Sequence, residues 1–225
     1  MKRQKPYLMV FVVLLWWGAW AHCQPNAVET SFVKAGLVDV RSIDRSIRVD
    51  LVNSDSNKNY FRENFYNGLN KAYLREEVAK KLSLAQKYLK SECPACSLLI
   101  MDAARPRTVS TQMYEKMKGT RFEKFVANPK KGSMHNYGIA VDVTLVDGQG
   151  QEMDMGFTPF YQSDLSIYWG YAKLKMFGLS KKQQENRNLL SRIMTRAGFV
   201  PLSFEWWHFD GMPKSEARGK YLIIE

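Results

Sequence analysis

Helix-like and strand-like segments follow one another in this chain without the regular alternation of a parallel α/β protein. Three segments carry apolar residues at helical spacing: residues 70–90, 108–118 and 181–197. Three others read as strands: residues 98–101, 137–146 and 199–210. This order predicts an α+β fold, with a mainly antiparallel sheet flanked by helices.

The remaining segments give weaker signals. Residues 22–36 show no clear period and are expected to be an extended lead-in, while residues 37–52 alternate loosely and suggest one or two short strands. Residues 53–67 are rich in Asn and Ser, which favours a loop. No internal repeat or linker is visible, so residues 22–225 are expected to form a single domain.

Residues 1–21 have the features of a secretory signal peptide. A basic start precedes an unbroken apolar run at 7–17, and Ala19 and Ala21 give the small-x-small pattern of a cleavage site. The apolar stretch is shorter than the roughly 20 residues of a membrane span. We therefore expect export to the periplasm or another extracytoplasmic compartment, with no stable membrane anchor after cleavage. A retained anchor and a lipoprotein modified at Cys23 are the alternatives.

The charge of the chain favours an anionic partner. The formal net charge is +11, and loss of residues 1–21 lowers it to +8 because three basic residues are removed. Nucleic acid, a membrane surface and an acidic cell-wall polymer all suit such a charge. In an exported protein we expect no nucleic acid partner, and export favours cell-wall or small-molecule substrates.

Cys93 and Cys96 form a C-x-x-C motif. Half of a zinc site and a redox motif are two readings, but the sequence has neither a second C-x-x-C nor a thioredoxin-like pattern around this one. In an oxidising compartment a local disulfide is favoured. Such a bridge would tie the end of a helix to the next strand.

Histidine is scarce, with three in the chain, and this narrows the choice of metal ligands. His22 falls at the signal boundary, which leaves His135 and His208. Asp142 lies on the predicted strand at 137–146, on the same face as two very small residues.

We expect His135 to reach Asp142 from the preceding turn, and His208 to reach it from the last strand. Two imidazoles and one carboxylate form a three-ligand zinc set with an open fourth position, which is typical of catalytic sites. Zinc in such a site acidifies its bound water and polarises a carbonyl.

Glu205 is the candidate general base for that water, because a carboxylate is needed near the metal without being a ligand. Residues i and i+3 of a regular strand point to opposite faces. Glu205 and His208 therefore meet only across a turn, a bulge or a helical stretch. The sequence is a poor helix here, so we predict a break in the strand at Trp206 and Trp207.

Two motifs carry a family resemblance. The stretch from Ser133 to Asp142 fits S-x-H-x-x-G-x-A-x-D, and the stretch from Glu205 to His208 fits E-x-W-H. Together they resemble the zinc D,D-peptidases, whose fold is shared with the Hedgehog signalling domain. The similarity is greatest to the D-alanyl-D-alanine dipeptidases of the vancomycin-resistance type.

The resemblance extends over roughly residues 45–210. Residues 102–106 resemble the family segment D-x-Y-R-P, with Ala104 in place of the aromatic residue. Residues 64–68 resemble N-F-x-G with one residue added.

The resemblance implies a role for each matching position. His135, Asp142 and His208 would hold one zinc ion per chain, and Glu205 would be the catalytic base. Arg105 would stabilise the developing oxyanion, since a fixed guanidinium in a dry site acts on charge that forms in the transition state.

One departure concerns substrate recognition. The dipeptidases usually carry M-G-T-P-F-D, whose Asp pairs with the free ammonium of the dipeptide. Here residues 155–161 read M-G-F-T-P-F-Y, so Tyr161 stands where the Asp is expected. Asp164 follows three residues later as a candidate substitute, and Ser133 keeps its place as a third substrate-binding candidate.

These observations lead to an exported zinc metallopeptidase that hydrolyses the dipeptide D-Ala-D-Ala. A D,D-carboxypeptidase acting on peptidoglycan stem peptides is the first alternative, especially if Asp164 does not replace the missing Asp. A non-catalytic, zinc-stabilised binding module is the second. Glu205 and Arg105 argue against that module, because a structural metal needs neither. The expected partners are a small D,D-peptide and peptidoglycan fragments.

Overall fold

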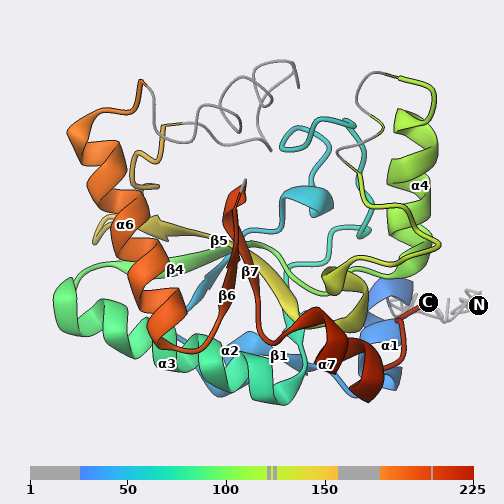
Figure 1. Ribbon diagram of the computed structural model, residues 1–225, viewed down its shortest axis with the longest axis horizontal. Coiled ribbons are helices and arrows are strands. Elements are labelled where there is room, and N and C mark those ends of the chain that lie inside the picture. Colours follow the sequence, from blue (N-terminus) through green and yellow to red (C-terminus); the bar gives the residue numbers. More distant parts are fainter. Residues whose placement is uncertain (1–25, 121–122, 124–125, 157–177, 204) are drawn as a thin grey trace, which may run out of the picture.

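A computed structural model describes residues 26–120, 123, 126–156, 178–203 and 205–225. At its centre lies a five-stranded sheet in the order β2-β4-β5-β7-β6 (Figure 1). The strands are β2 (Arg48–Val49), β4 (Ser97–Asp102), β5 (Ala140–Val146), β6 (Val200–Leu202) and β7 (Glu205–Asp210). β2 runs parallel to β4, and every other neighbouring pair is antiparallel. The predicted α+β fold with a mainly antiparallel sheet is therefore confirmed.

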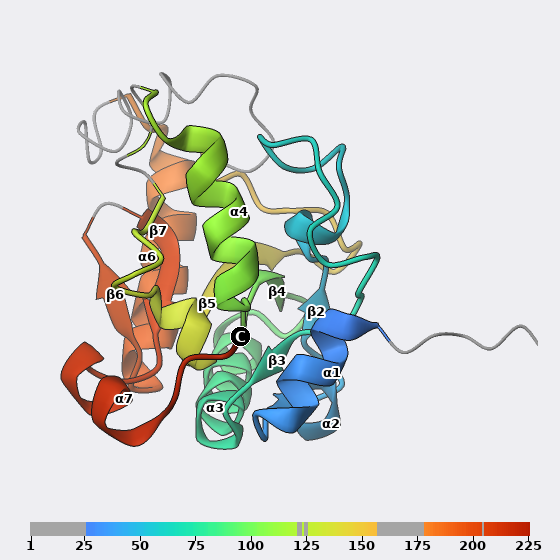
Figure 2. The same cartoon turned by 90° about the vertical axis from the view of Figure 1, so that its right-hand side faces the viewer.

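Helices surround this sheet. α3 (Glu76–Glu92) and α6 (Lys181–Arg196) contact each other and the sheet strands, while α4 (Arg107–Met117) stands on the opposite side of the molecule from α6 (Figures 1 and 2). The shorter helices are α1 (Ala27–Lys34), α2 (Val40–Ile43) and α7 (Lys214–Lys220). A second sheet pairs β1 (Val38–Asp39) with β3 (Tyr73–Leu74). Two 3-10 turns, η1 (Val52–Ser54) and η3 (Met134–Tyr137), complete the elements used below.

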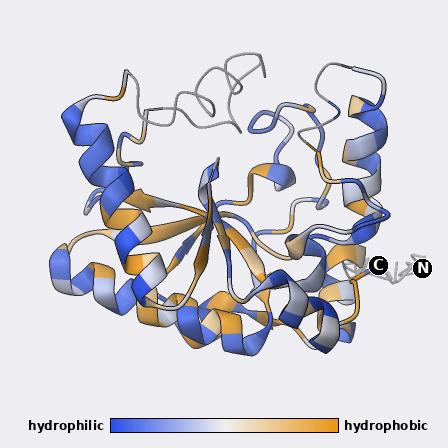
Figure 3. Ribbon diagram, in the orientation of Figure 1, coloured by the Kyte–Doolittle hydropathy of each residue, from blue (hydrophilic) through white to orange (hydrophobic). Residues whose placement is uncertain are grey.

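The apolar spacing of the sequence explains how the two long helices pack. In α3, Val78, Leu82, Ala85 and Leu89 are fully buried, and their spacing of three or four residues puts them on one face. Figure 3 shows the same pattern, with hydrophobic residues on the strands and on the inner faces of the helices. α6 begins at a capping box in which Ser180 and Gln183 satisfy each other's backbone N–H groups.

Several predicted boundaries were wrong. Residues 22–36 are not simply extended, because α1 forms there behind the N-cap Asn26. The segment at 70–75 contains β3, so α3 begins only at Glu76. The run at 199–210 is two paired strands, β6 and β7, rather than one.

The strand predicted at 137–146 begins later and is more buried than expected. Tyr137 belongs to the turn η3, and Gly138 follows in the left-handed conformation with φ 71°. β5 then runs from Ala140, and both of its faces are buried. Gly138 thus does not share a strand face with Asp142, and Asp142 instead lines a cavity.

The disulfide between Cys93 and Cys96 is formed. It joins the end of α3 to the start of β4, as the sequence predicted. Across the part of the chain that the structure describes, none of the helices is long and apolar enough to cross a bilayer. Residues 1–21 and Cys23 lie outside the described residues.

Candidate functional site

Three polar side chains lie in a row across the central strands. Asp102 on β4 pairs with Asp142 on β5, and Asp142 pairs with His208 on β7. Directly paired residues project from the same face of a sheet, so the register alone brings these three together. All three are buried. His135 joins them from η3, just before β5.

The structure brings together the three predicted metal ligands. His135 Nε2 lies 3.2 Å from His208 Nδ1, and Asp142 Oδ1 lies 3.0 Å from His208 Nδ1 and 3.5 Å from His135 Nε2. Ligand atoms around a tetrahedral ion with bonds of about 2.0–2.1 Å lie about 3.3–3.4 Å apart. The spacing of these three atoms therefore fits a small metal ion.

Each imidazole is held at the nitrogen that faces away from this point. His135 Nδ1 lies 2.6 Å from the carbonyl oxygen of Ala103, and His208 Nε2 lies 3.0 Å from Asp210 Oδ1. An acceptor at the outer nitrogen fixes the tautomer in which the inner nitrogen has a free lone pair. This outer support is typical of metal-binding histidines.

The electrostatics of the cluster favour an ionised Asp142. Burial alone would raise the pKa of this carboxyl, but His135 and His208 outweigh it and hold the pKa well below its usual range. Burial would lower the pKa of His208, whereas its hydrogen bonds with Asp142 and Asp210 raise it to about 10. Because a metal binds neutral imidazole, loading the site with metal would release the His208 proton.

Glu205 lies beside the three candidate ligands and is not part of their cluster. Its Oε2 is 3.9 Å from His208 Nδ1. β7 is one continuous strand from Glu205 to Asp210, so the strand is not interrupted at Trp206 and Trp207 as predicted. The expected irregularity takes another form: Pro201 pairs with Phe209 and Leu202 with Glu205, which leaves residues 206–208 as a bulge. This bulge brings the side chains at positions 205 and 208 together.

Arg105 is fixed by a buried carboxylate. Its guanidinium forms an ion pair with Asp102 and donates through Nε to Asp102 Oδ2 at 3.2 Å. Burial lowers the pKa of Arg105, but the charge of Asp102 outweighs it and keeps the pKa above its ordinary value. Arg105 is thus a permanent cation, and its side chain is 15% exposed.

Asp102 is itself surrounded by donors. It accepts hydrogen bonds from Tyr66 Oη at 2.8 Å, from Asn53 Nδ2 at 2.9 Å and from the Ala103 backbone N–H at 3.0 Å. Burial, together with the negative charge of Asp102, raises the pKa of Tyr66 well above its usual value, so its hydroxyl stays a donor. We call Asn53, Tyr66, Asp102 and Arg105 the arginine support cluster.

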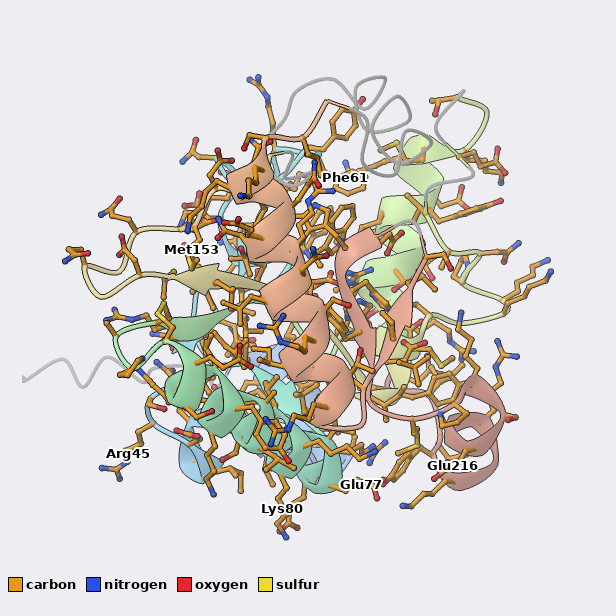
Figure 4. The ribbon with its side chains drawn as sticks, turned by 60° about the vertical axis from the view of Figure 1, so that its left-hand side comes forward. Arg45, Phe61, Glu77, Lys80, Met153 and Glu216 are labelled. Carbon is orange, nitrogen blue, oxygen red and sulfur yellow. A yellow bond between two sulfur atoms is a disulfide. The ribbon has the colours of Figure 1, made fainter. Side chains whose placement is uncertain are left out.

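A cavity of about 330 Å³ opens over the metal-ligand cluster. Among the described residues it is lined by His135, Asp142, His208, Glu205, Arg105 and Ser133. Its lining also contains apolar side chains, among them Phe61, which Figure 4 labels. Such a volume is at the lower end of the range for small-molecule sites.

Not every predicted site residue can be placed. Ser133 caps η3 and lines the cavity, and its Oγ accepts from the backbone N–H of His135 at 3.3 Å. Tyr161 and Asp164 lie outside the described residues.

Three residues that support the site, Asn53, Tyr66 and Asp210, were not predicted from the sequence. Asp210 had a readable signal, because it lies two residues after His208 and so shares its strand face. Tyr66 lies in the stretch 64–68 that resembles a family motif, but nothing local links Asn53 or Tyr66 to Asp102, which is 49 and 36 residues away and meets them only in the folded chain.

An antiparallel sheet carrying two His and one Asp, with a carboxylate and a guanidinium beside them, is the kind of site found in metallopeptidases. The chain belongs to peptidase family M15, since the family profile described as D-Ala-D-Ala dipeptidase matches residues 33–222.

Three similar proteins are each named D-alanyl-D-alanine dipeptidase. The one from Escherichia coli is 32% identical over 135 residues, which are 59% of this chain and 61% of that protein. The one from Synechocystis is 28% identical over 180 residues, with 64% and 71% covered, and the one from Enterococcus faecalis is 32% identical over 78 residues, with 34% and 36% covered. The present chain thus aligns with about three fifths of the Escherichia coli protein.

Proposed function

We propose that this protein is a zinc-dependent dipeptidase that hydrolyses D-Ala-D-Ala. The observation that carries the proposal is the convergence of three candidate metal-ligand atoms within 3.5 Å of one another, next to the carboxylate of Glu205 and the fixed cation of Arg105. Membership of the M15 family and the names of the three relatives support the substrate.

His135 Nε2, His208 Nδ1 and Asp142 Oδ1 would hold one zinc ion. This set of two nitrogens and one carboxylate oxygen is a donor combination that zinc accepts at catalytic sites, where a fourth position is left open. When bound there, zinc supplies Lewis acidity, which lowers the pKa of water and polarises a carbonyl oxygen.

Glu205 moves the proton in the proposed reaction. Its carboxylate accepts a proton from the water that attacks the peptide carbonyl carbon, and then gives that proton to the nitrogen of the leaving D-alanine. The products are two molecules of D-alanine, and Glu205 returns to its ionised form. The bulge at 206–208 matters here because it brings Glu205 to the same side as His208.

Arg105 stabilises the charge that develops on the carbonyl oxygen. The arginine support cluster fixes the guanidinium before substrate arrives, so little reorganisation is needed during the reaction.

The size of the cavity favours a small peptide. At about 330 Å³ it suits a dipeptide better than an extended polymer. Ser133 lines it as a substrate-binding candidate, and we propose Tyr161 and Asp164 as candidates for the ammonium end. If they do not bind a free ammonium, a D,D-carboxypeptidase acting on stem peptides, including peptidoglycan fragments, is the alternative.

Release of D-alanine by the purified protein tests this proposal. We expect release from D-Ala-D-Ala that a chelator abolishes and added Zn²⁺ restores, with one zinc per chain by elemental analysis. Release only from a stem pentapeptide ending in D-Ala-D-Ala would favour the carboxypeptidase. Tightly bound zinc without any hydrolysis would favour the non-catalytic module.

We also propose that residues 1–21 direct export and are removed, and that residues 22–225 fold as one domain. The mass of the purified protein and its N-terminal sequence test the first proposal. A mature chain that begins at Met1 in the cytoplasmic fraction would contradict it. A single cooperative unfolding transition is expected from one domain.

A further inference from the structure

We propose that Lys214 and Arg218 on α7 form a subsite that binds a carboxylate of the peptide substrate. This inference rests on the proposed peptidase function and adds a determinant of its specificity. Both residues line the cavity that contains the metal-ligand cluster. They lie four residues apart on one short helix, so they share a face of it.

The fold holds α7 in place at this end of the cavity. Ala217, between the two cations, is fully buried, and α7 packs against η3, which carries His135. Lys220 at the end of α7 donates to both carboxylate oxygens of Glu77 at 2.7 and 2.8 Å. These contacts hold the backbone of α7, and with it Lys214 and Arg218, in a fixed position.

Among the residues that the structure describes around the cavity, Arg105 and Asp142 each have an oppositely charged or imidazole neighbour. Arg105 is paired with Asp102, and Asp142 lies within 3.5 Å of two imidazoles. Lys214 and Arg218 are exposed and have no ion-pair partner among the residues that the structure describes. A divalent ion in the cluster would be offset by Asp142 and Glu205. The two cations on α7 would then remain as unmatched positive charge.

The acidic residue of α7 does not cancel this charge inside the cavity. Glu216 is exposed and is not among the residues that line the cavity; Figure 4 labels it on α7. α7 thus directs its two cations to the cavity and its carboxylate away from it.

The chemistry of these two side chains suits a carboxylate. A guanidinium binds a carboxylate through two parallel hydrogen bonds, and a lysine ammonium adds a compact positive charge. A D,D-peptide has a carboxylate one residue beyond the bond to be cleaved. A stem peptide has a further carboxylate within its chain, so the carboxylate is the chemistry that both substrates share.

Kinetics of a double variant test the subsite. For Lys214→Gln/Arg218→Gln we expect KM for D-Ala-D-Ala to rise about tenfold, with kcat within about twofold of the parent, because uniform binding is lost. KM of the parent should rise with salt, and KM of the variant should respond less.

The matched control removes two charges elsewhere. Arg45→Gln/Lys182→Gln changes the net charge equally, and Arg45 lies across the molecule from α7 in Figure 4. This control should keep the KM of the parent. An equal rise of KM in both variants would show a general charge effect and would overturn the subsite.

Two substrates separate the sources of the carboxylate. A rise of KM for D-Ala-D-Ala assigns the subsite to the C-terminal carboxylate. A rise confined to a stem pentapeptide assigns it to the internal carboxylate. Unchanged KM for both substrates in the Lys214→Gln/Arg218→Gln variant would overturn the proposal.

A binding measurement separates this inference from the proposed function. If the parent cleaves neither peptide, the dipeptidase proposal fails, and calorimetric titration of the Zn²⁺-loaded protein with D-Ala-D-Ala still tests the subsite. Weaker binding by the double variant than by its matched control would support the subsite. Equal affinities, or no binding by the parent, would overturn it.

Discussion

Arg105 shares its counter-ion with two neutral donors. Asp102 accepts from Tyr66 and Asn53 as well as from the guanidinium, so its negative charge is spread over several hydrogen bonds. Donors that compete for Asp102 leave more of the guanidinium available to a developing oxyanion. On the proposed mechanism, the arginine support cluster would therefore set both the position of Arg105 and its capacity to bind an oxyanion.

Replacing Tyr66 with Phe tests this view of the cluster. We expect kcat to fall by about tenfold with KM within about twofold, because the lost hydrogen bond mainly alters transition-state stabilisation. The metal content should be unchanged. Tyr73→Phe is the matched control, since Tyr73 is also buried and donates to a carboxylate, Glu29, at 2.6 Å outside the cavity. An equal kcat loss in the control would point to a general packing effect.

Asp210→Asn tests the outer support of His208. The carboxylate at 3.0 Å from His208 Nε2 makes the imidazole a better ligand, so the substitution should weaken Zn²⁺ binding about 10–100-fold. Competition with a chromogenic chelator measures this affinity, and the thermal midpoint serves as the folding control. An unchanged affinity would mean that Asp210 does not act through His208.

At the scale of the elements, regular periodicity was easier to predict than local turns. α6 and β5 are long enough for their patterns to show in the sequence. α1 escaped prediction because it has eight residues and a single buried one, Phe32. Tyr137, the last residue of η3, was read as the start of a strand, since it is buried like the residues of β5 that follow.

Gly138 connects η3 to β5, and its backbone requires glycine. Its φ is 71°, and an added Cβ would lie 2.7 Å from Leu37 Cδ2. We expect Gly138→Ala to lower the free energy of unfolding by about 1–3 kcal/mol, as measured by denaturant titration. Gly219→Ala, with nothing within 4 Å of the added atom, should instead be neutral or raise stability by up to about 1 kcal/mol. Equal effects at both positions would contradict this account.

At the scale of the whole molecule, the C-terminal segment forms hydrogen bonds with η3, α4 and α3, which lie around the site. The Ile224 backbone N–H donates to the Asn136 carbonyl in η3, and Ile224 in turn accepts from the Arg107 N–H at the start of α4. Lys220 and Tyr221 both contact Glu77 on α3, which Figure 4 labels. These contacts span up to 144 residues of sequence, so no local pattern predicts them.

The ion pair between Glu77 and Lys220 makes the stability of the folded protein depend on pH. Hydrogen bonds from Lys220 and Tyr221 lower the pKa of Glu77 below its usual value of 4.5. The stabilisation of the folded state by ionised Glu77 is therefore complete at pH values above this usual pKa. It is lost as the pH falls through the lower pKa that Glu77 has in the folded state. Glu77→Gln should lower the thermal midpoint by about 1–2 °C at pH 7, and the difference should vanish at the lowest pH at which the protein still folds. A difference that persists there would contradict the ion-pair explanation.

In the candidate site, too, contacts between residues far apart in the sequence could not be predicted from local patterns. The candidate metal ligands could be predicted because two histidines and one aspartate lie in dense local motifs. The residues that position them, and the two cations of α7, are brought together by sheet register and by the packing of the C-terminal segment. Sheet register and packing depend on residues far apart in the sequence, so no short stretch of sequence reveals these contacts.

Glu205→Gln, measured for both zinc content and D-alanine release, tests the central claim most directly. We predict one zinc per chain in parent and variant alike, with kcat for D-Ala-D-Ala reduced about 10²–10⁴-fold in the variant because the proton acceptor is lost. Full turnover by a zinc-loaded Glu205→Gln protein, or no turnover by the zinc-loaded parent, would contradict the proposed mechanism.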